Sequence, residues 1–260
     1  QAFPQSVQRN STVYCRGIMT TIPANLQAVK NRIRAASQSS GRDAGAVRLL
    51  AVSKTWPADY VRQAYKAGQR VFAESYVQEA VPKIAALDDL DLEWHFIGPV
   101  QSNKSRDIAE HFDWLDSLDR LKIAERLSAQ RPANLLPLQV CIQVNVSGEA
   151  SKSGLAPEDA AALARAVTAL PRLRLRGLMA IPEPGNDVAL LRRRFILLRE
   201  LLARLNTEGM KLDVLSMGMS DNFEIAIAEG ATIVRVGTAI FGARPKAEAY
   251  PEPIEELGPN

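Results

Sequence analysis

Short apolar runs alternate with helical patterns throughout this chain, and this alternation limits the folds open to it more than any other feature. Eight apolar runs are expected as strands, at residues 47–53, 70–73, 92–97, 114–118, 136–146, 173–181, 212–217 and 232–236. Helices are expected before the first run and between successive runs, at 25–40, 59–67, 76–87, 105–112, 121–130, 157–170, 188–205 and 222–228. Strict alternation of strands and helices predicts a parallel sheet.

The number and composition of the strands favour a closed barrel. The runs are short and continuously apolar, which is typical of strands that are buried on both faces. Eight strands close a (β/α)8 barrel of about 250 residues. The main alternative is a doubly wound open sheet, which is less favoured because the chain lacks a dinucleotide-binding fingerprint. We therefore predict a single α/β domain over residues 19–245, a (β/α)8 TIM barrel with an N-terminal helix.

Both ends of the chain fall outside this pattern. Residues 1–18 are polar and patternless, and Met19 follows them, so we expect a leader or a non-native segment there. Residues 246–260 contain several prolines and glutamates, and we expect them to form a loosely packed C-terminal tail.

Composition argues against several classes of function. The net charge is only +3, from 32 basic and 29 acidic residues, which argues against nucleic-acid binding. No apolar run is long enough to span a membrane. With two cysteines and two histidines in the chain, we expect no metal site. Cysteine usage fits a reducing compartment, so we expect a cytoplasmic protein, and we favour a monomer over a dimer.

Functional residues of such barrels lie at the carboxyl ends of the strands, and Lys54 follows the first predicted strand directly. Burial lowers the pKa of a lysine and makes its amine a nucleophile toward carbonyl groups. The alternative is that its ammonium group reaches solvent at the rim of the barrel. Position alone leaves both interpretations open.

The ends of the last two predicted strands resemble an anion site. Phosphate sites in these barrels commonly form from the loops after strands seven and eight. The first loop here contains Ser216, Gly218 and Ser220, and the second contains Gly237 and Thr238. Glycine allows backbone N–H groups to approach an anion, and hydroxyl groups add further donors.

Arg235 stands just before the second of these loops. A buried arginine needs a partner. One interpretation is an ion pair with a carboxylate such as Glu74. The other is a hydrogen bond to a heteroaromatic nitrogen of a ligand.

Several segments of the chain resemble the signatures of one family. They are AVSKT (51–55), WHFIGP (94–99), QSNK (101–104), VNVSGE (144–149), SKSG (151–154), LMAIP (178–182), LSMGMS (215–220) and GTAIFG (237–242). From about residue 26 to 244, the chain is similar to the pyridoxal phosphate homeostasis protein family, also called the proline synthetase co-transcribed family.

The resemblance implies a barrel like the N-terminal domain of alanine racemase, the third fold type of pyridoxal phosphate enzymes. It implies that Lys54 forms a covalent aldimine with the cofactor and that Arg235 faces the pyridine nitrogen. Ser216, Gly237 and Thr238 are expected to hold the phosphate. Further cofactor contacts are predicted at strand ends, from Ser75, Asn145, Met179 and Gly218. The chain departs from the family at Ala73 and Ser75, where the usual residues are glycine and asparagine.

The resemblance also favours a carrier over an enzyme. An arginine can only donate to the ring nitrogen, so the ring stabilises a carbanion poorly. Racemases of this fold add a tyrosine from a second domain, which we do not expect here because the chain ends soon after the barrel. His95 and Tyr76 are the candidates for a second base, but His95 is better explained as a hydrogen-bonded core residue.

We therefore predict no catalytic residues, and a role in binding, buffering and delivering pyridoxal phosphate, with apoenzymes that use this cofactor as partners. The alternative is an amino-acid racemase or lyase of the alanine racemase type. A third class, a cofactor-free aldolase with Lys54 as the reactive amine, would give a colourless protein.

Overall fold

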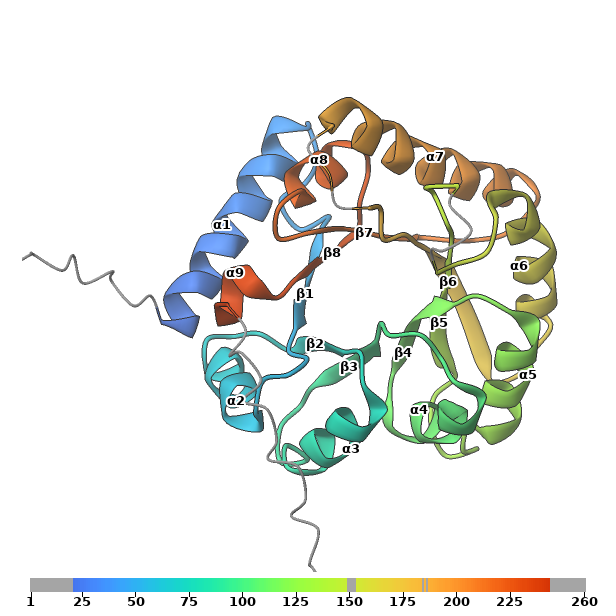
Figure 1. Cartoon of the computed structure of the whole chain (residues 1–260), viewed down its shortest axis with the longest axis horizontal. Coiled ribbons are helices and arrows are strands. Elements are labelled where there is room, and N and C mark those ends of the chain that lie inside the picture. The colour runs from blue at the N-terminus through green and yellow to red at the C-terminus, as the bar shows by residue number, and fades with distance from the viewer. Residues whose placement is uncertain (1–20, 149–152, 184, 186, 244–260) are drawn as a thin grey trace, which may run out of the picture.

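The computed structural model describes residues 21–148, 153–183, 185 and 187–243, and these residues form a closed barrel. Eight strands follow one another around the barrel in chain order, and every neighbouring pair is parallel. Figure 1 shows the strands as an inner ring with the helices around them. The predicted TIM barrel is thus confirmed, and the alternative of a doubly wound open sheet is wrong. The predicted leader (1–18) and tail (246–260) lie outside the described residues.

The elements match the predicted alternation closely. The strands are β1 Arg48–Val52, β2 Val71–Glu74, β3 Glu93–Phe96, β4 Trp114–Leu118, β5 Leu138–Gln143, β6 Leu173–Met179, β7 Val214–Met219 and β8 Ile233–Val236. The helices are α1 Ile22–Ser39, α2 Ala58–Lys66, α3 Val77–Ala85, α4 Ser105–His111, α5 Leu121–Gln130, α6 Ala160–Thr168, α7 Val188–Thr207, α8 Phe223–Ala228 and α9 Thr238–Phe241. Two short 3-10 turns, η1 Ser102–Lys104 and η2 Pro157–Asp159, were not expected from the sequence, and neither was α9.

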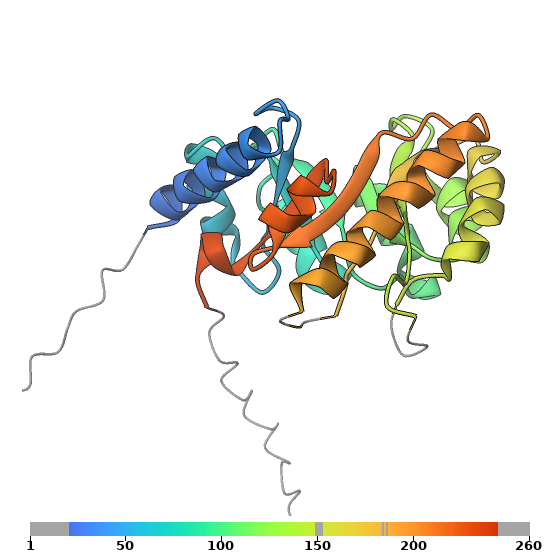
Figure 2. The same cartoon turned by 90° about the horizontal axis from the view of Figure 1, so that it is seen from above.

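Two apolar layers hold the barrel together. One side of each strand packs against the outer helices, of which α1 and α7 are the longest (Figure 2). The other side fills the inside of the barrel, where a second cluster contains Leu50, Val71, Ala73, Trp114, Cys141, Met179, Val214 and Ile233. Cys141 is fully buried there, and burial raises the pKa of its thiol. Burial of both strand faces explains the continuously apolar runs in the sequence.

Strand parity decides which side chains reach the inside of the barrel. In β8, Ile233 belongs to the inner cluster and Val234 to the outer one, so Arg235 points inward. The same alternation places His95 and Asp116 inside the barrel, where both side chains are fully buried. The barrel interior is therefore partly polar.

None of the helices in the described ranges is both long enough and apolar enough to cross a lipid bilayer.

Candidate functional site

The carboxyl ends of the strands surround a cavity of about 300 Å³. Five predicted site residues line it: Lys54, Ser75, Arg235, Gly237 and Thr238. Eight further residues complete the lining: Val52, Trp56, Ile97, Ile181, Met219, Ser220, Asp221 and Gly242. The volume lies at the lower end of the range for small-molecule sites, about 300–1,000 Å³.

Polar contacts from β2 and α3 hold the turn that carries Lys54. The Ser53 hydroxyl donates to Glu74 Oε1 at 2.7 Å, and Lys83 Nζ donates to the Ser53 carbonyl at 3.0 Å. Thr55 then takes a left-handed conformation, with φ of 69°, and its N–H donates to Glu79 Oε2 at 3.1 Å. A residue with a Cβ rarely adopts this backbone without support. The chain therefore bends sharply just after Lys54.

Glu74 and Lys83 form a buried ion pair at 2.7 Å between β2 and α3. Burial raises the pKa of the Glu74 carboxyl, against the opposing effect of the Lys83 charge. The second carboxylate oxygen, Oε2, has no hydrogen-bond partner among the described residues. The alternative in which Arg235 pairs with Glu74 is thus wrong, because Glu74 points to the outer layer of the barrel and Arg235 points inward.

Arg235 forms part of the cavity wall and is held by the backbone around it. Its Nη1 donates to the carbonyl oxygen and the hydroxyl of Ser216, at 2.6 and 2.9 Å, and its Nη2 donates to the Ala180 carbonyl at 2.8 Å. Burial lowers the pKa of Arg235 to about 10, although the Asp116 carboxylate opposes this shift. The guanidinium therefore remains charged at neutral pH. These contacts use three of its five N–H donors.

The end of β8 places small residues at the cavity. Gly237 lies so close to β1 that an added Cβ would stand 3.1 Å from the Val52 carbonyl oxygen. Thr238 follows it with an exposed side chain that lines the cavity. From the preceding loop, Met219 and Ser220 reach the cavity. Ser220 thus brings to the cavity one of the two hydroxyl groups predicted for the anion site in that loop.

Four predicted site residues do not line the cavity. Ser216 lies beneath Arg235 and donates to Asp116 Oδ2 at 3.0 Å. Met179 is fully buried inside the barrel. Gly218 has φ of 94°, and a Cβ there would stand 2.6 Å from the Ala226 Cβ, so this glycine allows close packing on α8. Asn145 Oδ1 accepts hydrogen bonds from the N–H groups of Ser147 and Gly148. Their contact with a ligand remains a prediction.

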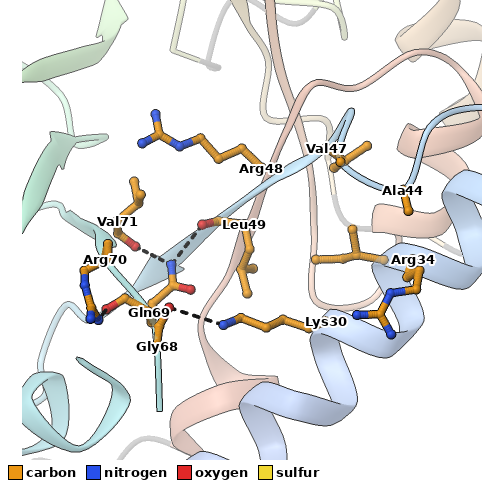
Figure 3. Close-up of a pocket in the computed structure, with 12 residues that line it drawn as sticks. Lys30, Arg34, Ala44, Val47, Arg48, Leu49, Gly68, Gln69, Arg70 and Val71 are labelled. Carbon is orange, nitrogen blue, oxygen red and sulfur yellow. Dashed lines mark hydrogen bonds between the residues drawn. The ribbon is translucent and has the colours of Figure 1, made fainter. Parts of the chain in front are cut away.

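A second, larger cavity of about 590 Å³ lies near the amino ends of β1 and β2 (Figure 3). Four cationic residues line it: Lys30, Arg34, Arg48 and Arg70. Their charged ends point in different directions rather than toward one centre. Lys30 donates to the Gly68 carbonyl, and Arg48 pairs with Glu93 at 2.7 Å. Because its charges do not converge, this cavity is a weaker candidate than the one beside Lys54.

Comparison with known proteins identifies the family. Residues 24–245 match the family described as alanine racemase, N-terminal domain. A pyridoxal phosphate homeostasis protein of Pseudomonas aeruginosa is 65% identical over 226 residues, which are 87% of this chain and 97% of that protein. The Escherichia coli K12 protein of the same name is 54% identical over 232 residues, covering 87% and 98%. This chain belongs to the pyridoxal phosphate homeostasis protein family.

Solved structures agree with the family and the fold. PipY of Synechococcus elongatus, in a structure described as having PLP bound, is 38% identical with a TM-score of 0.75, covering 85% of this chain and all of that one (100%). Alanine racemase of Corynebacterium glutamicum is 19% identical with a TM-score of 0.61, covering 86% of this chain and 63% of that one. At this lower identity, the racemase supports the fold alone.

Proposed function

We propose that this member of the pyridoxal phosphate homeostasis protein family binds pyridoxal phosphate in the cavity beside Lys54, and that it buffers and delivers the cofactor. One observation carries the proposal: a single cavity combines an amine, a buried guanidinium and a strand end that contains glycine and a hydroxyl group. The names of its relatives, and the PLP-bound neighbour, point to the same ligand.

The groups present match the chemistry of the cofactor. When bound, the cofactor supplies an aldehyde for covalent attachment and an electron-withdrawing ring. Lys54 would hold the aldehyde carbon through its amine, and Arg235 would donate to the ring nitrogen. The hydroxyl groups of Thr238 and Ser220 would donate hydrogen bonds to the phosphate, beside the Gly237 backbone. Ser75, whose side chain is shorter than the asparagine usual in the family, would lie at the edge of the ring.

The same residues support a carrier with little catalysis. Arg235 is charged at neutral pH and could only donate a hydrogen bond to the ring nitrogen, which would keep that nitrogen unprotonated and the ring weakly activated. His95, the candidate second base, is fully buried with both ring nitrogens hydrogen-bonded to carboxylates. Neither His95 nor Tyr76 lines the cavity. Rapid exchange of the Cα hydrogen of amino acids with solvent, catalysed by the purified protein, would contradict this part of the proposal.

Covalent trapping tests the binding site directly. The protein incubated with pyridoxal phosphate should be yellow, and borohydride should bleach it and leave a stable adduct on the peptide that contains Lys54. Lys54→Ala should lose the reducible adduct. The matched control is Lys30→Ala, a lysine of the second cavity, which should keep it. An unchanged adduct in Lys54→Ala would refute the assignment of Lys54.

Delivery to apoenzymes in the cytoplasm is part of the same proposal. The loaded protein should restore activity to an apoenzyme that depends on pyridoxal phosphate, even when a phosphatase destroys any cofactor free in solution. Restoration that the phosphatase abolishes would indicate release into solution rather than direct transfer.

A further inference from the structure

Hydrogen bonds between groups of alternating charge cross the inside of the barrel to the cavity. Glu93 Oε1 contacts His95 Nε2 at 2.9 Å, and His95 Nδ1 contacts Asp116 Oδ1 at 2.8 Å. Ser216 Oγ donates to Asp116 Oδ2 at 3.0 Å and accepts from Arg235 Nη1 at 2.9 Å. We call these five residues, Glu93, His95, Asp116, Ser216 and Arg235, the charge ladder. It begins at a half-buried carboxylate and ends at the cavity wall.

The geometry around His95 favours its doubly protonated form. Each of its ring nitrogens lies within hydrogen-bond distance of a carboxylate oxygen. A neutral imidazole carries one N–H, so only the imidazolium donates to both carboxylates. Burial opposes the charge, but the charges and hydrogen bonds of Asp116 and Glu93 outweigh it and raise the pKa of His95. The ring also stacks on Trp114, with centroids 4.8 Å apart, which fixes its plane.

Asp116 balances two buried cations. It contacts His95 directly and reaches Arg235 through Ser216. The other buried carboxylates of the described chain lie elsewhere: Glu74 pairs with Lys83 of α3, and Glu229 pairs with two arginines of α7. A buried cation without a partner costs several kcal/mol, so Arg235 depends on Asp116 for its compensation.

Ser216 determines the direction of the hydrogen bonds. A hydroxyl has one proton, and here Asp116 accepts it. The lone pairs of the same oxygen then accept from Arg235. If the Asp116 side chain became a donor toward Ser216, the hydroxyl would face two donors, one from residue 116 and one from Arg235. The hydrogen bond from Arg235 to the Ser216 hydroxyl therefore depends on Asp116 Oδ2 being an acceptor.

We propose that Asp116 and His95 are positioning residues, which act through Ser216 to hold Arg235 charged and oriented toward the ring nitrogen of the cofactor. This inference rests on the proposed function, because it needs the cofactor to lie in the cavity beside Lys54. It assigns the buried histidine and aspartate to the tuning of one arginine rather than to an acid–base pair.

The first experiment examines His95 without any cofactor. In the full chain at neutral pH, NMR of the imidazole should find both ring nitrogens protonated. Asp116→Asn keeps the shape of the side chain but replaces one acceptor with a donor, so His95 should lose one of its two ring protons. The matched control is Asp119→Asn, just beyond the end of β4, where the carboxylate pairs with Arg120 at the surface. A neutral His95 in the unsubstituted chain would overturn the proposal.

The second experiment measures pyridoxal phosphate binding. Asp116→Asn should raise the Kd by roughly 10- to 100-fold, since hydrogen bonds to a charged group are weakened. It should also shift the absorption maximum of the bound cofactor, which a general loss of stability would not do. Asp119→Asn should change neither property. A folded Asp116→Asn protein with unchanged Kd and spectrum would overturn the proposal.

If Asp116→Asn does not fold, Glu93→Gln replaces it in both experiments. Glu93 is only half-buried, and glutamine retains an oxygen that can accept a hydrogen bond from His95, so this variant is expected to fold. The pKa of His95 should fall and the absorption maximum should shift in the same direction, by a smaller amount. If both properties stay unchanged in Glu93→Gln, the proposal that the charge ladder acts on Arg235 is contradicted. If the unsubstituted chain fails to bind the cofactor while His95 carries both protons, the proposed function is wrong and the ladder's protonation stands.

Discussion

The two ends of the barrel differ in how their charged groups are arranged. The cavity at the amino ends of β1 and β2 is the larger, at about 590 Å³ against 300 Å³, and four cationic residues line it. Its charges point apart (Figure 3): Lys30 donates to the Gly68 carbonyl, and Arg48 pairs with the half-buried Glu93. At the carboxyl ends, groups of different chemistry meet around one small space: an amine, a guanidinium and hydroxyl groups. Volume and charge alone therefore do not identify a site, whereas convergence of complementary groups does.

Ion pairs at the two ends should differ most strongly in their contribution to stability. Lys83→Met leaves the Glu74 carboxylate buried without its partner, which should cost about 3–5 kcal/mol of unfolding free energy. Arg48→Met removes a pair whose side chains are 43% and 30% exposed, which should cost about 0–1 kcal/mol. Denaturant titration measures both values. Equal losses would contradict the view that the turn at Lys54 and Thr55 is supported by a buried charge pair.

Glycines with similar backbone at the two ends should also respond differently to substitution. Gly218 has φ of 94°, and a Cβ there would meet Ala226 at 2.6 Å, so Gly218→Ala adds overpacking to backbone strain and should cost about 2–4 kcal/mol. Gly41, before β1, has φ of 66° with no atom within 4 Å of an added Cβ. Gly41→Ala should cost only the strain, about 1–2 kcal/mol. Thermal unfolding compares the two variants.

The sequence predicted the barrel, and five of its nine candidate site residues line the cavity, for one physical reason. Burial on both faces makes the strands readable as apolar runs, and the strand ends then contain Lys54, Arg235, Gly237 and Thr238. The four-residue helix α9 was missed because it is too short to show a helical period.

The register of the strand pairs decides which residue of β7 lies beside Arg235. The pairing of β7 with β8 shifts between Ser216 and Met219, so Met219, rather than Ser216, lies level with Arg235. No local sequence pattern reveals such a shift. The direction of Glu74 follows from strand parity once the structure places Ala73 in the inner cluster, because the next residue along β2 must then point outward.

A hydroxyl at the small cavity should matter more for binding than a full charge at the large one. Thr238→Val removes a proposed donor to the phosphate, and the Kd for pyridoxal phosphate should rise by roughly 10-fold. Arg34→Ala removes a cation from the other cavity and should leave the Kd unchanged. Both values come from fluorescence or absorbance titration of the full chain. Weaker binding in Arg34→Ala would indicate that the large cavity also contributes to recognition.

A further expected effect is a dependence of stability on pH at the amino end of the barrel. Burial disfavours the charge of Glu93, but hydrogen bonds from His95 and Arg48 outweigh it and lower the pKa of Glu93 from 4.5 to about 2. The native state therefore binds this proton more weakly than the unfolded state. The stability that Glu93 contributes is complete above pH 4.5 and disappears as the pH falls through about 2. The difference in unfolding free energy between the unsubstituted chain and Glu93→Gln should shrink across that window. A difference that stays constant down to pH 2 would mean that Glu93 acts through packing rather than charge, and would separate it from the charge ladder.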